Sequence, residues 1–471
     1  MTAELIDSAP AIDESRSRRT RRGWVLAAAS AASFMVALDL LVVTTSLDTI
    51  RRDLGTSTAS LQWIVTAYGV SFAALLLTGA ALGDRFGRRR TMSIGLAVFA
   101  LGSAGAALSS EVGVLIACRA VQGVGGAIIL PIGLTIVTSV FPPSRRGTAI
   151  GVLEGVTGLA VIAGPVVGGA VSHWLPWQWI FWINVPVALV AILVVQVVVE
   201  ETFGPDRTID LAGLVLVSMA ATATVWALAR ANAVGWASAE FIAAAAIGLF
   251  AVIGFVAWER RAPAPMLPRR LFRSHAFPLG VATAFFVAAS LYVAVFFMAQ
   301  YMQAALGVDT LGAGLRLLPW TATLFVTAPL AGALADRVGY RPVLSFGLFA
   351  QTIGMGWLAV VAGGSPSYSA LVVPLIVTGI GTSAALPVTQ AAIIGAVGDH
   401  DIGKAAGVNN MFQELGGAFG VALGVVAFSA SGGHLTPADV SDGFVASMAV
   451  ATTLAAVAFC FSLTIPRSER L

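Results

Sequence analysis

Charged residues are scarce in this chain. Asp, Glu, Lys and Arg make up only 11% of the 471 residues, whereas 58% are hydrophobic, and the mean hydropathy is +0.89. A soluble protein of this length could not hide so much apolar surface from water. Apolar runs of about 20 residues recur along the chain, which is the length of an α-helix that crosses a ~30 Å hydrocarbon core. We therefore expect an all-α polytopic membrane protein.

Cysteine and histidine are also scarce, with two and four residues. Cys118 and Cys460 both lie in predicted spans, so packing explains them better than a disulfide or a metal site. The histidines form no recognisable catalytic or metal-binding pair, which disfavours a membrane-bound enzyme. The spacing from Gly398 to Lys404 imitates a phosphate-binding loop, but Ala405 follows where Ser or Thr is required. We expect no metal, cofactor or nucleotide, and an ion gradient as the energy source.

The apolar runs number fourteen, and their limits are approximate. They lie at roughly 24–46, 61–82, 91–109, 112–138, 147–171, 178–199, 211–230, 239–258, 277–301, 312–332, 341–361, 368–393, 404–428 and 442–465.

The distribution of cations predicts the orientation. If the arginine-rich start is cytoplasmic, that side carries 22 of the 27 Lys and Arg residues, because only five lie elsewhere. This is the positive-inside asymmetry, and it places both termini in the cytoplasm. One inner segment, 200–210, is acidic instead. No segment is long enough for the soluble domain that a sensor or receptor would need. A multi-pass protein of a bacterial inner membrane is expected, since Arg far exceeds Lys and Ala, Gly and Val are abundant.

An internal repeat indicates two related halves. Residues 83–90 (GDRFGRRR) recur as 335–342 (ADRVGYRP), an offset of 252 (336 − 84). Gly and Pro residues from Gly123 to Gly164 recur from Gly379 to Gly420 with an offset of 256 (379 − 123). Both offsets skip eight spans, so spans seven and eight form an insert between halves of equal orientation.

These offsets define the expected organisation. We predict a disordered cytoplasmic tail at 1–23, an N-terminal six-helix half at 24–199, two inserted helices at 211–258, a cytoplasmic linker at 259–276 and a C-terminal six-helix half at 277–465. The proline-rich linker is expected to form a short amphipathic helix on the membrane surface.

The repeated charged loop suits a conformational gate. Glycine allows a tight turn, Asp84 can cap a neighbouring helix N-terminus, and the arginines can reach other cytoplasmic ends and lipid phosphates. The alternative is that the arginines only fix topology. The residues that we assign to the gate are Asp84, Arg85, Gly87, Arg88, Asp336, Arg337 and Gly339.

At this point the chain resembles the major facilitator superfamily, and in particular its fourteen-helix drug:proton antiporter branch. The family's loop motif, G-x-L-a-D-r-x-G-r-[kr], fits residues 82–89 with Ala80 in place of its first Gly, and Gly332 restores that Gly in the second copy. The resemblance implies the major facilitator fold with two inserted helices, and no enzymatic activity.

Span five carries a second motif of the family. G-x8-G-P-x-x-G-G, which marks export in the family, fits Gly155, Gly164, Pro165, Gly168 and Gly169. Glycines let helices approach closely and a proline bends a helix, so this span could seal the site against leak at the interface of the halves. Ordinary small-residue packing is the alternative.

Two charged residues lie within early spans. Arg119 is similar to the arginine of the family's R-x-x-q-G motif, and a cation at the centre of a span costs about 2.5–3.5 kcal/mol or more, so it needs a partner. Asp39 lies at a matching depth in span one, within a sequence that resembles the branch's L-D-x-T-[IV]-V element. The pair is a candidate for proton coupling, and a static structural ion pair is the alternative.

Two further acids, Glu154 and Glu414, lie within spans. A carboxylate there can bind a proton or neutralise a cationic substrate. Glu154 could instead be a charge that reaches the membrane surface. The polar neighbours of Glu414 suggest a cavity wall. The aromatic surface of span nine suits apolar cations, although aromatics at helical spacing more often serve packing or lipid contacts. The residues assigned to substrate binding are Glu414, Asn410, Gln413, Tyr292, Phe296 and Gln300.

The sequence thus predicts a proton-coupled multidrug exporter. It would act as a monomer in lipid, alternate between inward- and outward-open states, and expel hydrophobic, cationic drugs or dyes, without a nucleic-acid partner. A dedicated exporter of one natural product or lipid is the alternative within transport.

Overall fold

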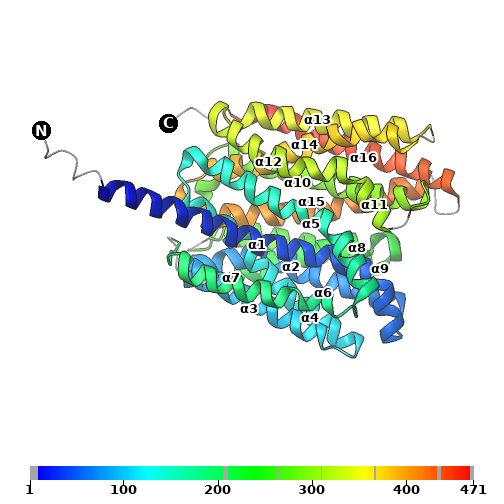
Figure 1. The fold of residues 1–471 in the computed structure, drawn as a ribbon, viewed down its shortest axis with the longest axis horizontal. Coiled ribbons are helices and arrows are strands. Elements are labelled where there is room, and N and C mark those ends of the chain that lie inside the picture. Colours follow the sequence, from blue (N-terminus) through cyan, green and yellow to red (C-terminus); the bar gives the residue numbers. More distant parts are fainter. Residues whose placement is uncertain are drawn as a thin grey trace, which may run out of the picture.

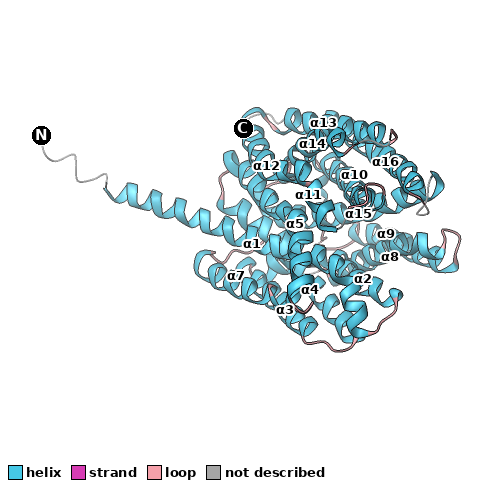
Figure 2. Cartoon of the chain, turned by 45° about the vertical axis from the view of Figure 1, so that its right-hand side comes forward, coloured by secondary structure: helices cyan, strands magenta, loops and turns pink. Residues whose placement is uncertain are grey.

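The structure is a computed structural model that describes residues 9–204, 210–263, 265–308, 310–364, 367–431 and 436–466; some side chains within these ranges, including those of residues 9–19, lie outside the description. Helices form the described residues almost throughout, and no strand occurs among them (Figure 2). The α-helices are α1 (Ala9–Leu54), α2 (Thr58–Phe86), α3 (Arg88–Ala107), α4 (Val112–Val140), α5 (Arg146–Trp174), α6 (Trp179–Trp182), α7 (Asn184–Val198), α8 (Leu211–Val234), α9 (Ala239–Glu259), α10 (Ala276–Ala304), α11 (Thr310–Arg316), α12 (Leu318–Val338), α13 (Tyr340–Ala362), α14 (Tyr368–Gly395), α15 (Ile402–Ser431) and α16 (Pro437–Thr464).

Thirteen spans within the described residues are long and apolar enough to cross a membrane. The 29-residue helix α5, some of whose side chains lie outside the description, occupies the place of the predicted fifth span. Helix starts follow local capping chemistry: Ser57, Asp210 and Ser238 accept hydrogen bonds from backbone N–H groups three residues later. Thr436 and Asp439 form a capping box at the start of α16.

The two halves repeat one packing pattern. In the first half α1 packs on α5, and α4 packs on both α2 and α3; in the second half α10 packs on α15, and α14 packs on both α12 and α13. The halves meet along two seams, α5 with α12 and α2 with α15. Figure 1 shows the resulting arrangement, with α13, α14 and α16 on one side of the bundle and α3, α4 and α7 on the other.

The inserted helices lie beside one seam. Helix α8 packs on α9 and also contacts α2 and α15, which belong to different halves. Trp63 of α2 and Trp226 of α8 have ring centroids 4.8 Å apart. Of the thirteen described spans, α9 has the smallest buried share, and the two helices lie together at the side of the bundle (Figure 2).

Two expectations about the ends of elements were wrong. The tail is helical rather than disordered from Ala9 onward, as α1 extends out of the bundle (Figure 1); residues 1–8 lie outside the described residues. The linker forms only a 3₁₀ turn, Arg269–Phe272, because Pro263, Pro265 and Pro268 lack the N–H donors of a helix.

Spans six and ten are each divided. Helices α6 and α7 are separated at Ile183, and α11 and α12 at Leu317. Pro186 and Pro319 follow these breaks closely, and a proline ring clashes with the carbonyl group four residues earlier.

Candidate functional site

The repeated charged turn is shorter than the sequence indicates. Its acidic residues end α2 and α12, and its later residues begin α3 and α13, so the predicted eight-residue loop was wrong. A single glycine joins each helix pair, with φ of +96° at Gly87 and +93° at Gly339. Residues with a Cβ rarely adopt these angles, so each turn depends on its glycine.

In the second copy, Asp336 binds the start of α5. Its Oδ1 accepts a hydrogen bond from Gly147 N at 2.9 Å, and its Oδ2 accepts bonds from the backbone N and the hydroxyl of Thr148, both at 2.8 Å. The carboxylate thus satisfies the free N–H groups of the first turn of α5 and faces the positive end of its dipole. This contact joins α12 of the second half to α5 of the first.

The first copy lies against the matching helix of the other half. A Cβ placed on Gly403, in the first turn of α15, would lie 2.9 Å from Asp84 Oδ1. Arg88 Nη2 donates to the same oxygen at 3.0 Å. Gly403 and Gly147 are separated by the repeat offset of 256 residues, so both turns contact equivalent helix starts across the seams. Of the other gate residues, Arg85 lies over the Phe86 ring at 5.1 Å, and Arg337 is exposed.

The acidic segment after α7 supports the first turn. Glu201 accepts hydrogen bonds from Arg89 N at 2.9 Å and Arg90 N at 3.1 Å, which caps α3. Glu200 forms an ion pair with Arg21 of α1. Glu201 therefore caps a helix, and Glu200 pairs with an arginine, at the end of the bundle where most arginines lie. These contacts explain why this segment is acidic and departs from the positive-inside pattern.

Asp39 and Arg119 form a fully buried ion pair. Asp39 Oδ1 accepts further hydrogen bonds from Gln122 Nε2 at 3.0 Å and from Asn184 Nδ2 at 2.8 Å. Arg119 Nε donates to Ile64 O at 3.2 Å. A buried charge pair is stable only when such bonds satisfy the remaining groups, and this network joins four helices of the first half.

Tyr68 separates this network from the space between the halves. The Arg119 guanidinium carbon lies 4.4 Å from the centroid of the Tyr68 ring, which is a cation–π contact. The Tyr68 hydroxyl and Arg119 Nη2 are buried and have no hydrogen-bond partner among the described residues. Unpaired buried polar atoms are costly, so both atoms raise the free energy of this conformation.

A cavity of about 210 Å³ lies between the two halves. Helices α1, α2, α4 and α5 line it from one side, and α10, α14 and α15 line it from the other. Its polar and aromatic lining residues are Ser33, Tyr68, Phe72, Glu154, Thr157, Tyr292, Gln390, Asn410, Gln413 and Glu414.

Two carboxylates reach this cavity from opposite halves. Glu154 belongs to α5 and Glu414 to α15, and no ion pair of either occurs among the described residues. The Tyr292 hydroxyl donates to Glu414 Oε1 at 3.4 Å, and the Gln390 side chain lies beside Glu154 in the cavity lining. Each acid thus faces a neutral hydrogen-bonding partner, which leaves room for a cation or a proton.

The other predicted substrate residues divide into two groups. Asn410 and Gln413 line the cavity, whereas Phe296 and Gln300 are not among its lining residues. Phe296 is 42% exposed, and its ring centroid lies 5.0 Å from that of Phe297. Asp39 and Arg119 also lie outside the lining, behind Tyr68. Among the described residues no cluster of His, Cys, Asp and Glu is arranged to hold a metal ion.

The glycine motif of α5 lies at two helix interfaces. A Cβ on Gly155 would lie 3.4 Å from Leu324 O of α12, in the seam between the halves, and a Cβ on Gly164 would lie 2.7 Å from Leu41 Cβ of α1. Gly168 is buried. The side chain of Pro165 and the environment of Gly169 lie outside the described residues.

Sequence reasoning did not select Tyr68, Gln390 or Asn184. Asn184 carried a usable signal, because an amide within an apolar span needs a partner. Gln390 had the same signal, whereas nothing in the sequence distinguishes Tyr68 from an interfacial aromatic residue.

Comparison with known proteins agrees with this geometry. A sequence model of the Major Facilitator Superfamily matches residues 29–259 and 280–471. The tetracenomycin C resistance and export protein of Streptomyces glaucescens is 32% identical over 415 residues, which are 87% of this chain and 77% of the relative. The multidrug resistance protein Stp of Mycobacterium tuberculosis is 30% identical over 393 residues, or 83% and 73% of the two chains. The solved structure of the proton:xylose symporter XylE has a TM-score of 0.69 at 14% identity, over 96% of this chain and 97% of its own, and shows the same fold.

Proposed function

Because this chain belongs to the major facilitator superfamily, and is therefore a membrane transporter rather than an enzyme, we propose that it is a proton-coupled antiporter. It exports hydrophobic, cationic drugs or dyes by alternating access. It resides in a bacterial inner membrane with both termini in the cytoplasm, as the positive-inside pattern and the bacterial relatives favour. Membrane lipid surrounds it, and it transports its substrate as a monomer.

One observation carries the proposal: two carboxylates face one cavity from opposite halves, and neither forms an ion pair with a described residue. A cationic substrate that binds Glu154 or Glu414 takes the place of a proton, and a proton that binds the same carboxylate releases the substrate. Because the acids belong to different halves, a rocking motion changes the cavity around both. The gate turns hold the arginine-rich end together in this conformation, so export requires those contacts to break and reform.

Asp39 and Arg119 have a different place in this mechanism. They lie behind Tyr68 and are already compensated, so a substrate cation does not reach them in this conformation. We propose that Asp39 takes up a proton only when Arg119 shifts, which changes the packing of α1 on α4. This assigns the pair to conformational coupling, and assigns the cavity acids to substrate and proton exchange.

The test is ethidium transport by the purified protein in liposomes with an imposed pH gradient. Glu154→Gln and Glu414→Gln keep the size of the side chain and remove its charge, and we expect at least one of them to reduce gradient-driven transport at least tenfold. Glu111→Gln is the matched control, because Glu111 is an exposed acid outside the cavity, and it should transport normally. Normal transport by both cavity variants would contradict the proposed coupling acids.

Asp39→Asn needs a second readout. It leaves Arg119 as an unpaired buried charge, which costs about 3–5 kcal/mol. The melting temperature of the purified variant in detergent is therefore measured beside its transport in liposomes, so that unfolding is distinguished from a loss of coupling.

A dedicated exporter of one natural product is the second candidate. The relative from Streptomyces glaucescens carries the name of a single antibiotic, and 210 Å³ is small for a pocket that accepts many drugs. Absence of transport for a panel of unrelated cationic dyes, with an intact fold, would favour this candidate.

A further inference from the structure

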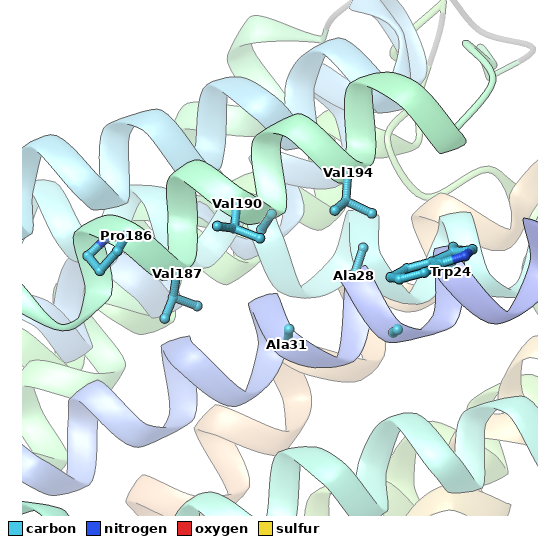
Figure 3. Close-up of a pocket in the computed structure, with 9 residues that line it drawn as sticks. Trp24, Ala28, Ala31, Pro186, Val187, Val190 and Val194 are labelled. Carbon is cyan, nitrogen blue, oxygen red and sulfur yellow. The ribbon is translucent and has the colours of Figure 1, made fainter.

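A second hollow lies on the outside of the bundle, between α1 and α7. It has a volume of about 420 Å³ and is apolar throughout. Figure 3 shows side chains of both helices pointing into it, with Trp24 and Val194 at one end and Pro186 at the other. The residues that line this groove are Trp24, Ala27, Ala28, Ala31, Pro186, Val187, Val190, Ala191 and Val194.

The groove faces the membrane and not the central cavity. Trp24 is 56% exposed and Val190 is 60% exposed, and neighbouring Leu189 and Leu193 of α7 also point outward. The central cavity is lined by Val36 and Leu40, which lie on another face of α1. The groove is therefore distinct from the proposed transport site, and lipid covers its mouth.

Its dimensions fit the hydrocarbon chain of a lipid. Small alanines on α1 leave a hollow where larger side chains would close the contact with α7. Seven residues separate Trp24 from Ala31, which is about 10 Å along a helix. One leaflet of the hydrocarbon core is about 15 Å deep, half of the full thickness. The groove thus follows a single leaflet for most of its depth.

The Arg21 guanidinium and the Trp24 indole lie at one end of the groove, in the arginine-rich part of the chain. Arg21 lies one turn before Trp24, on the same face of α1. Its Nε donates to Val198 O at 2.9 Å, one turn beyond Val194, and its Nη1 pairs with Glu200. Guanidinium and indole N–H groups at the membrane surface are typical partners of lipid phosphates.

We propose that the groove binds one acyl chain of a phospholipid from this leaflet, with the phosphate held at Arg21. The chain fills the space between α1 and α7, and the phosphate shares the guanidinium with Glu200. The bound lipid therefore ties together two helices of the first half beside the segment that caps α3.

Trp24 provides the test. The purified full-length chain in detergent is titrated with phosphatidylglycerol that carries brominated acyl chains, which quench tryptophan fluorescence at contact. The signal of Trp24 is the difference between the native protein and Trp24→Phe. We expect quenching that saturates near one lipid per protein. Ala31→Leu, which fills the groove, should raise the half-saturating concentration at least tenfold, and Arg21→Gln at least threefold.

Ala243→Leu is the matched control, since it adds the same bulk at an exposed position of α9, and it should bind like the native protein. Quenching that rises without saturation, or that Ala31→Leu leaves unchanged, would overturn the proposal by showing only bulk contact. Loss of lipid quenching on addition of tetraphenylphosphonium would also overturn it, because it would assign the groove to a hydrophobic cation.

Discussion

At the scale of single residues, the unpaired hydroxyl of Tyr68 leads to a prediction about stability. The ring of Tyr68 stacks on Arg119, while its buried hydroxyl has no partner among the described residues. An unsatisfied buried donor costs about 1–3 kcal/mol. Tyr68→Phe keeps the ring and removes this cost, so we expect it to raise the free energy of unfolding of this conformation by about 1 kcal/mol. Thermal unfolding in detergent measures the change.

Tyr68→Ala is the companion variant. It removes the ring as well as the hydroxyl and should destabilise the protein by about 3–5 kcal/mol, as for other buried aromatic residues. A lower melting temperature for Tyr68→Phe would mean that the hydroxyl has a partner in the resting protein, and the prediction would then be wrong.

Residue chemistry predicted much of the candidate site. Glu154, Glu414, Asn410 and Gln413 all reach the cavity, since polar groups in apolar spans avoid lipid and gather where the halves meet. Phe296 was assigned to the same surface and lies elsewhere. Aromatic residues are stable against both lipid and protein, so the sequence alone does not fix which face they occupy.

At the scale of helices, the contact between Asp336 and α5 predicts a shift between conformations. Asp336→Ala leaves two backbone N–H groups and the Thr148 hydroxyl without their acceptor. Loss of an N-terminal cap costs about 1 kcal/mol. This corresponds to about a fivefold change in the equilibrium constant between the closed and the open conformation of the gate. Spin labels at Ser144 and His400, on a background without Cys118 and Cys460, should therefore report a larger population of long distances.

Thr148→Val is the matched control for this prediction. It removes only the hydroxyl bond and keeps both backbone caps, so its distance distribution should stay close to that of the native protein. Equal distributions for native and Asp336→Ala would show that the cap does not hold this end closed.

Helix existence was easier to predict than helix ends. Hydropathy located the spans because the membrane imposes their length. It missed the breaks at Ile183 and Leu317, because an apolar run continues through a proline that the backbone cannot follow. It also placed Asp84 and Asp336 in loops. Charge suggested a turn there, but only the glycine leaves the helix, and the acids extend α2 and α12 toward the opposite half.

At the scale of the whole molecule, the repeat produces symmetric seams around an asymmetric interior. Each half offers one acid to the cavity, yet the buried pair of Asp39 and Arg119 belongs to the first half alone. In the second half, the offset of 256 places Leu375 and Thr378 where the first half has Arg119 and Gln122. The halves therefore share the machinery of the gate but not the internal ion pair.

This arrangement predicts electroneutral exchange. A cavity between apolar walls resists a change in its net charge, because an uncompensated charge away from water is costly. A substrate with one positive charge should therefore displace one proton, since the second acid remains protonated when no second cation pairs with it. No net charge then crosses the membrane in a cycle. We expect a pH gradient to drive ethidium transport in liposomes, whereas a potential of 100 mV imposed with potassium and valinomycin should change the final concentration ratio of the dye less than twofold.

Glu414→Gln separates this prediction from its opposite. An exchange that moves one net charge gains about 2.3 kcal/mol per 100 mV, which corresponds to roughly a 50-fold change in the final concentration ratio of the dye. A response of that size by the native protein would mean that both acids release protons for each cation. If the variant with one acid removed then lost the response to potential, the second proton would be assigned to Glu414, and the charge balance of the cavity would not govern the cycle.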